Sequence, residues 1–263
     1  MPSDTPTGQH VDVNGVSLYV EESGDGPPLV LVHGGTVTSR MWSAIRPLLA
    51  EHFRVITPDT RGHGRSTNPT GELTYAAVAD DVAALIEALG LDRPFVGGWS
   101  DGGQVTLEFG MRHPGAARAL VVGGALYDFK SPAYLNSITA MLGSFTPDNI
   151  DFEAFEAENV EWIAAMREWH MQRDDQWQSV IDKTLGLWLG YPGLTQAQIA
   201  SITTPTLVIL GDRDEVVPVQ VAVDMLNWLP DAELAILPGH THGRAFAAPD
   251  VFVAAVVDYL KRH

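Results

Sequence analysis

The chain has 263 residues, of which 45% are hydrophobic and 19% are charged, and its formal net charge is −17. These values are typical of a globular protein with a full hydrophobic core. The negative charge argues against nucleic acid and anionic membranes as partners, and the lack of cysteine excludes a thiolate nucleophile, a disulfide framework and a cysteine-ligated metal site.

The N-terminal stretch MPSDTPTGQ has neither the basic start nor the apolar core of a signal peptide, and no apolar run reaches membrane-spanning length. We therefore expect a cytoplasmic protein without a membrane partner. After this stretch, HVDVNGVSLYVEESG alternates apolar and polar residues around Asn14 and Gly15, which predicts an antiparallel hairpin.

Short, nearly continuous apolar runs follow along the chain: LVLVHGG, FRVITPD, PFVGGW, RALVVGG, PTLVILGD and AELAILPG. Such runs are typical of parallel strands that are buried on both faces. Helical patterns separate them, with Thr74 as the expected cap of a helix that closes at Gly90, and Pro249 at the start of the last helix. The alternation predicts an α/β fold: an open, mostly parallel sheet of about eight strands flanked by helices.

Residues 127–203 interrupt this alternation because they contain no convincing strand and many acidic residues. Four tryptophans lie in this segment: Trp162, Trp169, Trp177 and Trp188. We interpret the segment as a helical cap over the edge of the sheet, with one or two of its tryptophans facing a pocket. The predicted domains are an α/β core of residues 1–126 and 204–263 and a cap of residues 127–203.

Polar residues collect at the predicted carboxyl ends of the strands, whereas the starts of the strands carry no comparable polar motifs. These ends carry HGG at 33–35, DTRGHG at 59–64, WSDGG at 99–103, GDRDEVVP at 211–218 and GHTHG at 239–243. Because ligands bind outside the carboxyl ends of the strands in an open parallel sheet, we expect the functional site there.

Ser100 is the candidate nucleophile. It lies in GWSDG at 98–102, a G-x-S-x-G pattern that forms a sharp strand-to-helix turn and exposes the serine hydroxyl. The oxyanion formed by attack on an acyl group needs two fixed N–H donors. The backbone amides of Gly35 and Asp101 are the candidates for this oxyanion hole.

A serine nucleophile needs a histidine base, which a carboxylate must orient. In this architecture the partners follow the serine in the order acid, then histidine. After Ser100, the strand ends offer Asp212 or Asp214 as the acid and His240 or His242 as the base. The residue pattern alone leaves both pairs open.

Over essentially its whole length, the chain resembles proteins of the α/β-hydrolase fold superfamily. Five motifs match that superfamily in position and order: HGG, DTRGHGRS, GWSDGG, GDRDEVVP and PGHTHG. The resemblance implies that Asp214 is the acid and His242 the base, and that DTRGHGR is structural rather than a phosphate or metal site. We expect no cofactor and no metal. The GWSDGG turn is similar to that of the biphenyl-hydrolase-like or valacyclovirase branch.

The leading hypothesis is a serine hydrolase that cleaves a small-molecule carboxylic ester, a lactone or a related acyl bond through an acyl-enzyme. Two alternatives stay open: a C–C bond hydrolase or cofactor-free oxygenase that uses the same triad, and a ligand sensor with negligible turnover. Among esters, we expect neutral ones to be preferred over those with a free ammonium group, because the sequence identifies no carboxylate dedicated to a cation in the pocket.

Overall fold

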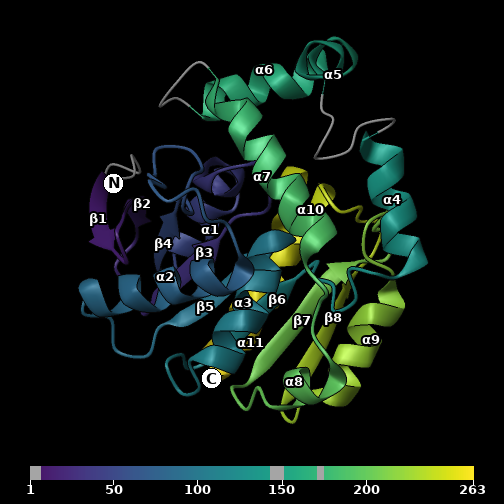
Figure 1. Ribbon diagram of the computed structural model, residues 1–263. Helices are drawn as coiled ribbons and strands as arrows, with labels where there is room; N and C mark the ends of the chain where they lie inside the picture. The colour runs from purple at the N-terminus through teal and green to yellow at the C-terminus, as the bar shows by residue number, and fades with distance from the viewer. Residues whose placement is uncertain (1–6, 143–150, 171–174) are drawn as a thin grey trace.

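The computed structural model describes residues 7–142, 151–170 and 175–263. One eight-stranded sheet runs through its centre in the order β1-β2-β4-β3-β5-β6-β7-β8 (Figure 1). The strands are β1 (Thr7–Val13), β2 (Val16–Ser23), β3 (Pro28–Val32), β4 (Arg54–Pro58), β5 (Phe95–Trp99), β6 (Leu120–Gly123), β7 (Thr206–Gly211) and β8 (Ala232–Leu237). β2 is antiparallel to both of its neighbours and every other neighbouring pair is parallel, which confirms the predicted open, mostly parallel sheet.

The predicted hairpin is formed by β1 and β2. Val13 pairs with Val16, and between them Asn14 and Gly15 have φ angles of 46° and 76°. A two-residue hairpin turn with this twist requires positive φ at both central residues, which asparagine and glycine tolerate best. The local sequence therefore sets the register of these two strands.

The order of the strands reverses at β3. β4 pairs with one edge of β3 and β5 pairs with the other edge, so the chain returns to the opposite side of β3 after it has formed β4. The carboxyl ends of β3 and β5 consequently lie side by side at a topological switch point, which is where open α/β sheets bind ligands.

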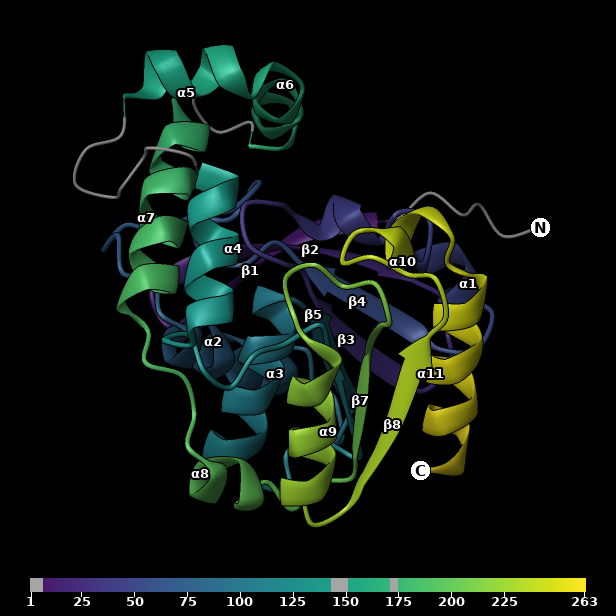
Figure 2. The same cartoon turned by 90° about the vertical axis from the view of Figure 1, so that its right-hand side faces the viewer.

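Helices cover both faces of the sheet (Figure 2). One face carries α2 (Tyr75–Ala88), α3 (Asp101–Arg112) and α9 (Val219–Trp228), and the other carries α1 (Arg46–Ala50) and α11 (Asp250–Arg262). Two shorter helices lie in loops, η1 (Ser39–Trp42) and α10 (Arg244–Ala247). Thr74 caps α2 as predicted, because its hydroxyl accepts a hydrogen bond from the amide of Ala77 at 3.0 Å.

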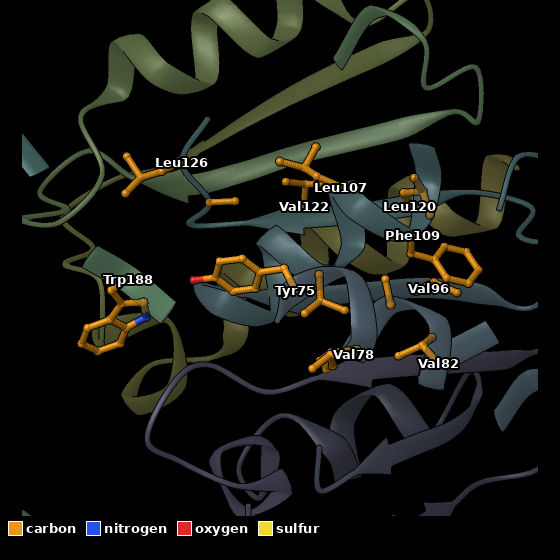
Figure 3. Close-up of a cluster of buried hydrophobic side chains, with 14 of the residues drawn as sticks. Tyr75, Val78, Val82, Val96, Leu107, Phe109, Leu120, Val122, Leu126 and Trp188 are labelled. Atoms are coloured by element: carbon orange, nitrogen blue, oxygen red, sulfur yellow. The ribbon is translucent and has the colours of Figure 1, made fainter. Parts of the chain in front are cut away.

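The larger part of the core lies between the sheet and helices α2 and α3. Figure 3 shows Val78 and Val82 of α2 and Leu107 and Phe109 of α3 packed toward Val96 of β5. All five side chains are almost completely buried. This packing fixes the start of α3, and with it the turn that precedes the helix, against the ends of the strands.

Between β6 and β7 the described residues form helices and no strand. These are α4 (Pro132–Leu142), α5 (Phe152–Glu158), α6 (Val160–Trp169), α7 (Gln176–Gly190) and α8 (Gln196–Ala200). Helices α4 to α7, called the helical insertion below, lie beyond the carboxyl ends of the strands (Figure 1). The division into a core and a cap of residues 127–203 stays a prediction. None of the helices in the described ranges has the length and apolarity that crossing a membrane requires.

Candidate active site

Ser100 lies in a sharp turn between β5 and α3. Its φ is 58° and its ψ is −119°, a conformation that residues other than glycine rarely adopt. The chain passes so closely here that a Cβ atom on Gly98 would lie 2.3 Å from the backbone of Gly102, and one on Gly102 would lie 2.0 Å from the carbonyl oxygen of Val32. Strain of this kind costs on the order of 1–3 kcal/mol and is found where a side chain must be held for function.

Asp214 and His242 form a hydrogen-bonded pair at the ends of β7 and β8. His242 Nδ1 lies 2.8 Å from Asp214 Oδ2, and the carboxylate is fully buried. Asp214 Oδ1 accepts from the amides of Val216 at 2.9 Å and Val217 at 2.8 Å. Because a carboxylate accepts, His242 Nδ1 is the donor in this hydrogen bond, and in the neutral ring Nε2 is then the nitrogen with the free lone pair. His242 is therefore in the tautomer that a general base requires.

The neighbouring pair, Asp212 and His240, has other partners. Asp212 is exposed, and its Oδ1 accepts from the amide of Gly239 at 2.5 Å. His240 is buried, with Nδ1 2.9 Å from the carbonyl oxygen of Pro238 and Nε2 3.3 Å from that of Ala248. Both side chains brace the loop after β8, and neither is among the described residues around the cavity that Ser100 faces. The geometry thus favours Asp214 and His242.

The ring of His33 orients the peptide that carries the amide of Gly35. Its Nε2 accepts from the amide of Thr60 at 2.9 Å, which leaves the proton on Nδ1, and Nδ1 donates to the carbonyl of Gly34 at 2.7 Å. The C=O and N–H of a trans peptide point in opposite directions, so this bond directs the Gly35 N–H away from His33. Burial lowers the pKa of His33 and keeps the ring neutral, as both hydrogen bonds require.

The amide of Asp101 is the second candidate oxyanion donor. Asp101 is the first residue of α3, and the first N–H groups of a helix have no acceptor within the helix. The loop with Gly35 is close by, because a Cβ atom on Gly34 would lie 3.4 Å from Ser100 Cβ. The structure therefore brings both candidate donors to the turn that holds the serine.

A cavity of about 830 Å³ connects these residues, and Gly35, Ser100, Asp101 and His242 all line it. Four aromatic side chains form much of its wall: Phe129, Tyr134, Trp162 and Trp188. Three of them come from the helical insertion: Tyr134 of α4, Trp162 of α6 and Trp188 of α7. Two of the three are tryptophans, in agreement with the expectation that one or two tryptophans of this segment would face the pocket. Among the described residues around the cavity, none is a lysine or an arginine, and two are acids.

Asp101 is one of the residues that line the cavity, and its carboxylate binds Trp188, which lines it too. From the sequence, only the amide of Asp101 had a predicted role. Its Oδ1 accepts from the Tyr75 hydroxyl and from the Trp188 indole N–H, each at 2.8 Å, and Figure 3 shows these two donors facing each other. Burial raises the pKa of Asp101 to about 6, against the opposing effect of the hydrogen bonds from Trp188 and Tyr75. The sequence identified no carboxylate dedicated to a cation in the pocket; the structure places the buried carboxylate of Asp101 on Trp188, a residue of the cavity wall.

Glu215 is the second acid at the cavity, and the sequence analysis did not single it out. Its Oε2 accepts from the backbone amide of His242 at 3.1 Å, and its carbonyl oxygen accepts from Ser137 Oγ at 3.3 Å. The side chain thus helps to hold the backbone of the histidine loop. In the sequence, the one sign that Glu215 lies at the site is its position directly after Asp214.

The segment DTRGHGR forms internal contacts, as the resemblance implied. Asp59 accepts from the amides of Ser39 at 2.9 Å and Arg65 at 3.0 Å. Arg61 binds the carboxylate of Asp81 through two hydrogen bonds of 2.7 Å. Asp59, Arg61 and Asp81 are buried, so the charges of this segment are satisfied inside the protein.

The chain is similar to known proteins over almost its whole length. The model of the "Alpha/beta hydrolase family" matches residues 29–255. A pimeloyl-[acyl-carrier protein] methyl ester esterase of Nitrosospira multiformis is 29% identical, over 94% of this chain and 99% of that protein. A 2-hydroxy-6-oxo-6-(2'-aminophenyl)hexa-2,4-dienoic acid hydrolase of Metapseudomonas resinovorans is 27% identical, over 96% and 90%. The crystal structure of a serine hydrolase involved in carbazole degradation superposes with a TM-score of 0.79 at 26% identity, over 98% of this chain and 100% of that one.

Proposed function

The chain belongs to the alpha/beta hydrolase family, and from this membership we propose that it is a serine hydrolase that cleaves carboxylic esters of small molecules through an acyl-enzyme. The observation that carries the proposal is the placement of Ser100 and His242 on one cavity, with the ring of His242 held by Asp214. A nucleophile, a base and a group that orients the base are the parts that acyl transfer needs.

In the proposed reaction, the Ser100 hydroxyl attacks the ester carbonyl carbon while Nε2 of His242 takes its proton. Asp214 stabilises the imidazolium, and the amides of Gly35 and Asp101 bind the oxyanion of the tetrahedral intermediate. His242 then gives the proton to the leaving alcohol, and the acyl group stays on Ser100. A water molecule, deprotonated by His242, attacks the acyl group, releases the acid and restores the serine.

The charges around the cavity support an ester rather than an anionic substrate. The Metapseudomonas relative is named for a hexa-2,4-dienoic acid, and such an acid is negative at neutral pH. The described cavity wall of this chain has Asp101 and Glu215 but no lysine or arginine. An anion placed beside Asp101 would lose hydration without gaining a cationic partner. This observation disfavours C–C hydrolysis of such acids.

A set of charged and neutral benzyl esters tests this proposal. At neutral pH and high salt, we expect alanine benzyl ester to be hydrolysed at least as well as its N-acetyl form, and both at least about tenfold better than monobenzyl succinate in kcat/KM, which is ~1.4 kcal/mol of transition-state free energy. The reason is the Asp101 carboxylate, which attracts an ammonium group and repels a carboxylate. High salt screens the long-range effect of the net charge of −17, so the remaining difference is local. This order reverses the preference for neutral esters that we expected from the sequence.

Asp101→Asn is the matched control, because an amide oxygen can still accept from Tyr75 and Trp188 while the charge is removed. In this variant, the ratio of kcat/KM between the neutral or cationic esters and monobenzyl succinate should become smaller. In the wild type it should also shrink as the pH falls through about 6, where the Asp101 carboxylate takes up a proton. Equal rates for the succinate and neutral esters, or a discrimination that Asp101→Asn leaves unchanged, would contradict the assignment.

A further inference from the structure

Two imidazole rings bridge the loop of residues 33–38, called the oxyanion loop below, to the loop of residues 59–66. The first ring is that of His33, which donates to the Gly34 carbonyl within the oxyanion loop and accepts from the amide of Thr60 in the other loop. The second is that of His170, which follows α6 of the helical insertion and is buried with 2% exposure. His33 therefore comes from the loop that follows β3, and His170 comes from the helical insertion.

The hydrogen bonds of His170 permit a single protonation state. Its Nδ1 accepts from the amide of Gly64 at 2.9 Å, and its Nε2 lies 3.0 Å from the carbonyl oxygen of Thr36. An amide only donates and a carbonyl only accepts, so Nε2 carries the proton. Burial lowers the pKa of His170 to about 4, and the ring is therefore neutral at neutral pH. The ring of His63 lies between the two bridges, with its centroid 5.2 Å from that of His33 and 5.8 Å from that of His170.

Thr36 is a residue whose conformation needs such support. Its φ is 58°, a value that a β-branched residue rarely adopts. Conformations of this kind persist where the surrounding structure holds them. Thr36 is buried, follows Gly35 directly and lines the cavity. The carbonyl that His170 holds is therefore part of the same short loop as the candidate oxyanion donor.

We propose that His170 is a positioning residue of the active site. It donates to the Thr36 carbonyl while His33 donates to the Gly34 carbonyl, and the two bonds together fix the amide of Gly35 for oxyanion binding. The oxyanion site is then complete only when the helical insertion is docked. This inference rests on the proposed function, in which the Gly35 amide stabilises the tetrahedral intermediate.

The two nitrogens of His170 can be tested separately. In His170→Gln the amide N–H lies near the position of Nε2 and keeps a donor for Thr36. In His170→Asn the amide oxygen lies near the position of Nδ1 and keeps an acceptor for Gly64. For a neutral p-nitrophenyl ester we expect His170→Asn to lower kcat about tenfold with KM little changed, and His170→Gln to stay within about threefold of the wild type; deleting an oxyanion donor outright costs ~10²–10³.

The affinity for a trifluoromethyl ketone inhibitor is a second measurement, and a loss of folding stability alone would not change it. Its adduct with the serine carries an oxyanion that needs the same amides, so its affinity should fall in His170→Asn in parallel with kcat. The control is Gln176→Ala, because Gln176 of the insertion donates to the carbonyls of Gly62 at 3.2 Å and Gly64 at 3.1 Å in the 59–66 loop. We expect this variant to melt at a lower temperature but to keep the wild-type kcat.

All variants are assayed as folded protein below their melting temperatures. Equal kcat values in His170→Asn and His170→Gln would overturn the inference, as would an unchanged ketone affinity in His170→Asn. Failure of the proposed function has a different signature, which is a wild type that neither hydrolyses esters nor reacts with a fluorophosphonate. That result would remove the positioning role together with the reaction it serves.

Discussion

Replacing Ser100 with alanine is expected to lower kcat for a p-nitrophenyl ester by about 10⁵-fold or more and to abolish labelling by a fluorophosphonate. Without the hydroxyl no acyl-enzyme forms, and the residual rate comes from binding and the oxyanion amides alone. The fold should persist, because alanine has the same Cβ atom as serine and meets the same backbone strain at a φ of 58°. Intact-protein mass after labelling and steady-state kinetics measure the two effects.

The control for this variant is another serine on the same cavity. Ser137 lines the cavity, but its hydroxyl donates to the backbone carbonyl of Glu215 and it does not lie at the strained turn. The Ser137→Ala protein should therefore still be labelled by the fluorophosphonate at Ser100 and keep most of its activity on the p-nitrophenyl ester. A Ser100→Ala protein that is still labelled, or that still hydrolyses the ester at near the wild-type rate, would remove the proposed mechanism.

His242→Ala is expected to lower kcat by at least about 10⁴-fold, because His242 is the one imidazole among the described residues that line the cavity. His240→Ala is the matched comparison two residues away. Its ring contacts the carbonyls of Pro238 and Ala248 inside the loop, so its loss should lower the melting temperature and leave kcat within a few-fold of the wild type. A severe loss of kcat in His240→Ala with a mild one in His242→Ala would exchange their assigned roles.

The same comparison can be made for the acid, between Asp214→Asn and Asp212→Asn. In Asp214→Asn, the side-chain oxygen would stay with the amides of Val216 and Val217, and the NH₂ group would face His242 Nδ1. That arrangement forces the proton onto Nε2, where the ring can no longer act as a base, and we expect a loss in kcat of about 10⁴-fold. In Asp212→Asn the exposed side chain keeps an oxygen that accepts from the amide of Gly239, so kcat should stay close to the wild-type value.

Much of this architecture could be predicted because local signals and the fold agree. The alternation of apolar runs and helical patterns predicted the sheet, and Asn14 and Gly15 predicted the turn between β1 and β2. The order of polar strand ends predicted that Gly35 and Ser100 would meet either His240 or His242, and the resemblance to the α/β-hydrolase fold implied His242. Gly35, Ser100 and His242 do line one cavity. The sheet and the hairpin followed from local patterns, whereas the choice between the two histidines needed the family resemblance.

The remaining features depend on contacts between distant parts of the chain. The direction of the Asp101 carboxylate is set by Tyr75, which precedes it by 26 residues, and by Trp188, which follows it by 87. His170 is a single histidine in a helical segment without a motif, and its partner Thr36 lies 134 residues earlier. No pattern within a short stretch of sequence encodes either contact, so only the folded structure reveals them.

The helical insertion has a consequence for protein engineering. Trp162 and Trp188 of the insertion line the cavity, while Ser100, Asp214 and His242 come from the ends of strands. Under the proposed function, much of the aromatic wall around the substrate comes from the insertion and the triad comes from the strand ends, so exchanging the insertion for that of another family member is a route to a new specificity. The exchange carries one condition: a transplanted segment that brings no hydrogen-bond donor to the Thr36 carbonyl would yield a chimera that binds its new substrate and turns it over slowly.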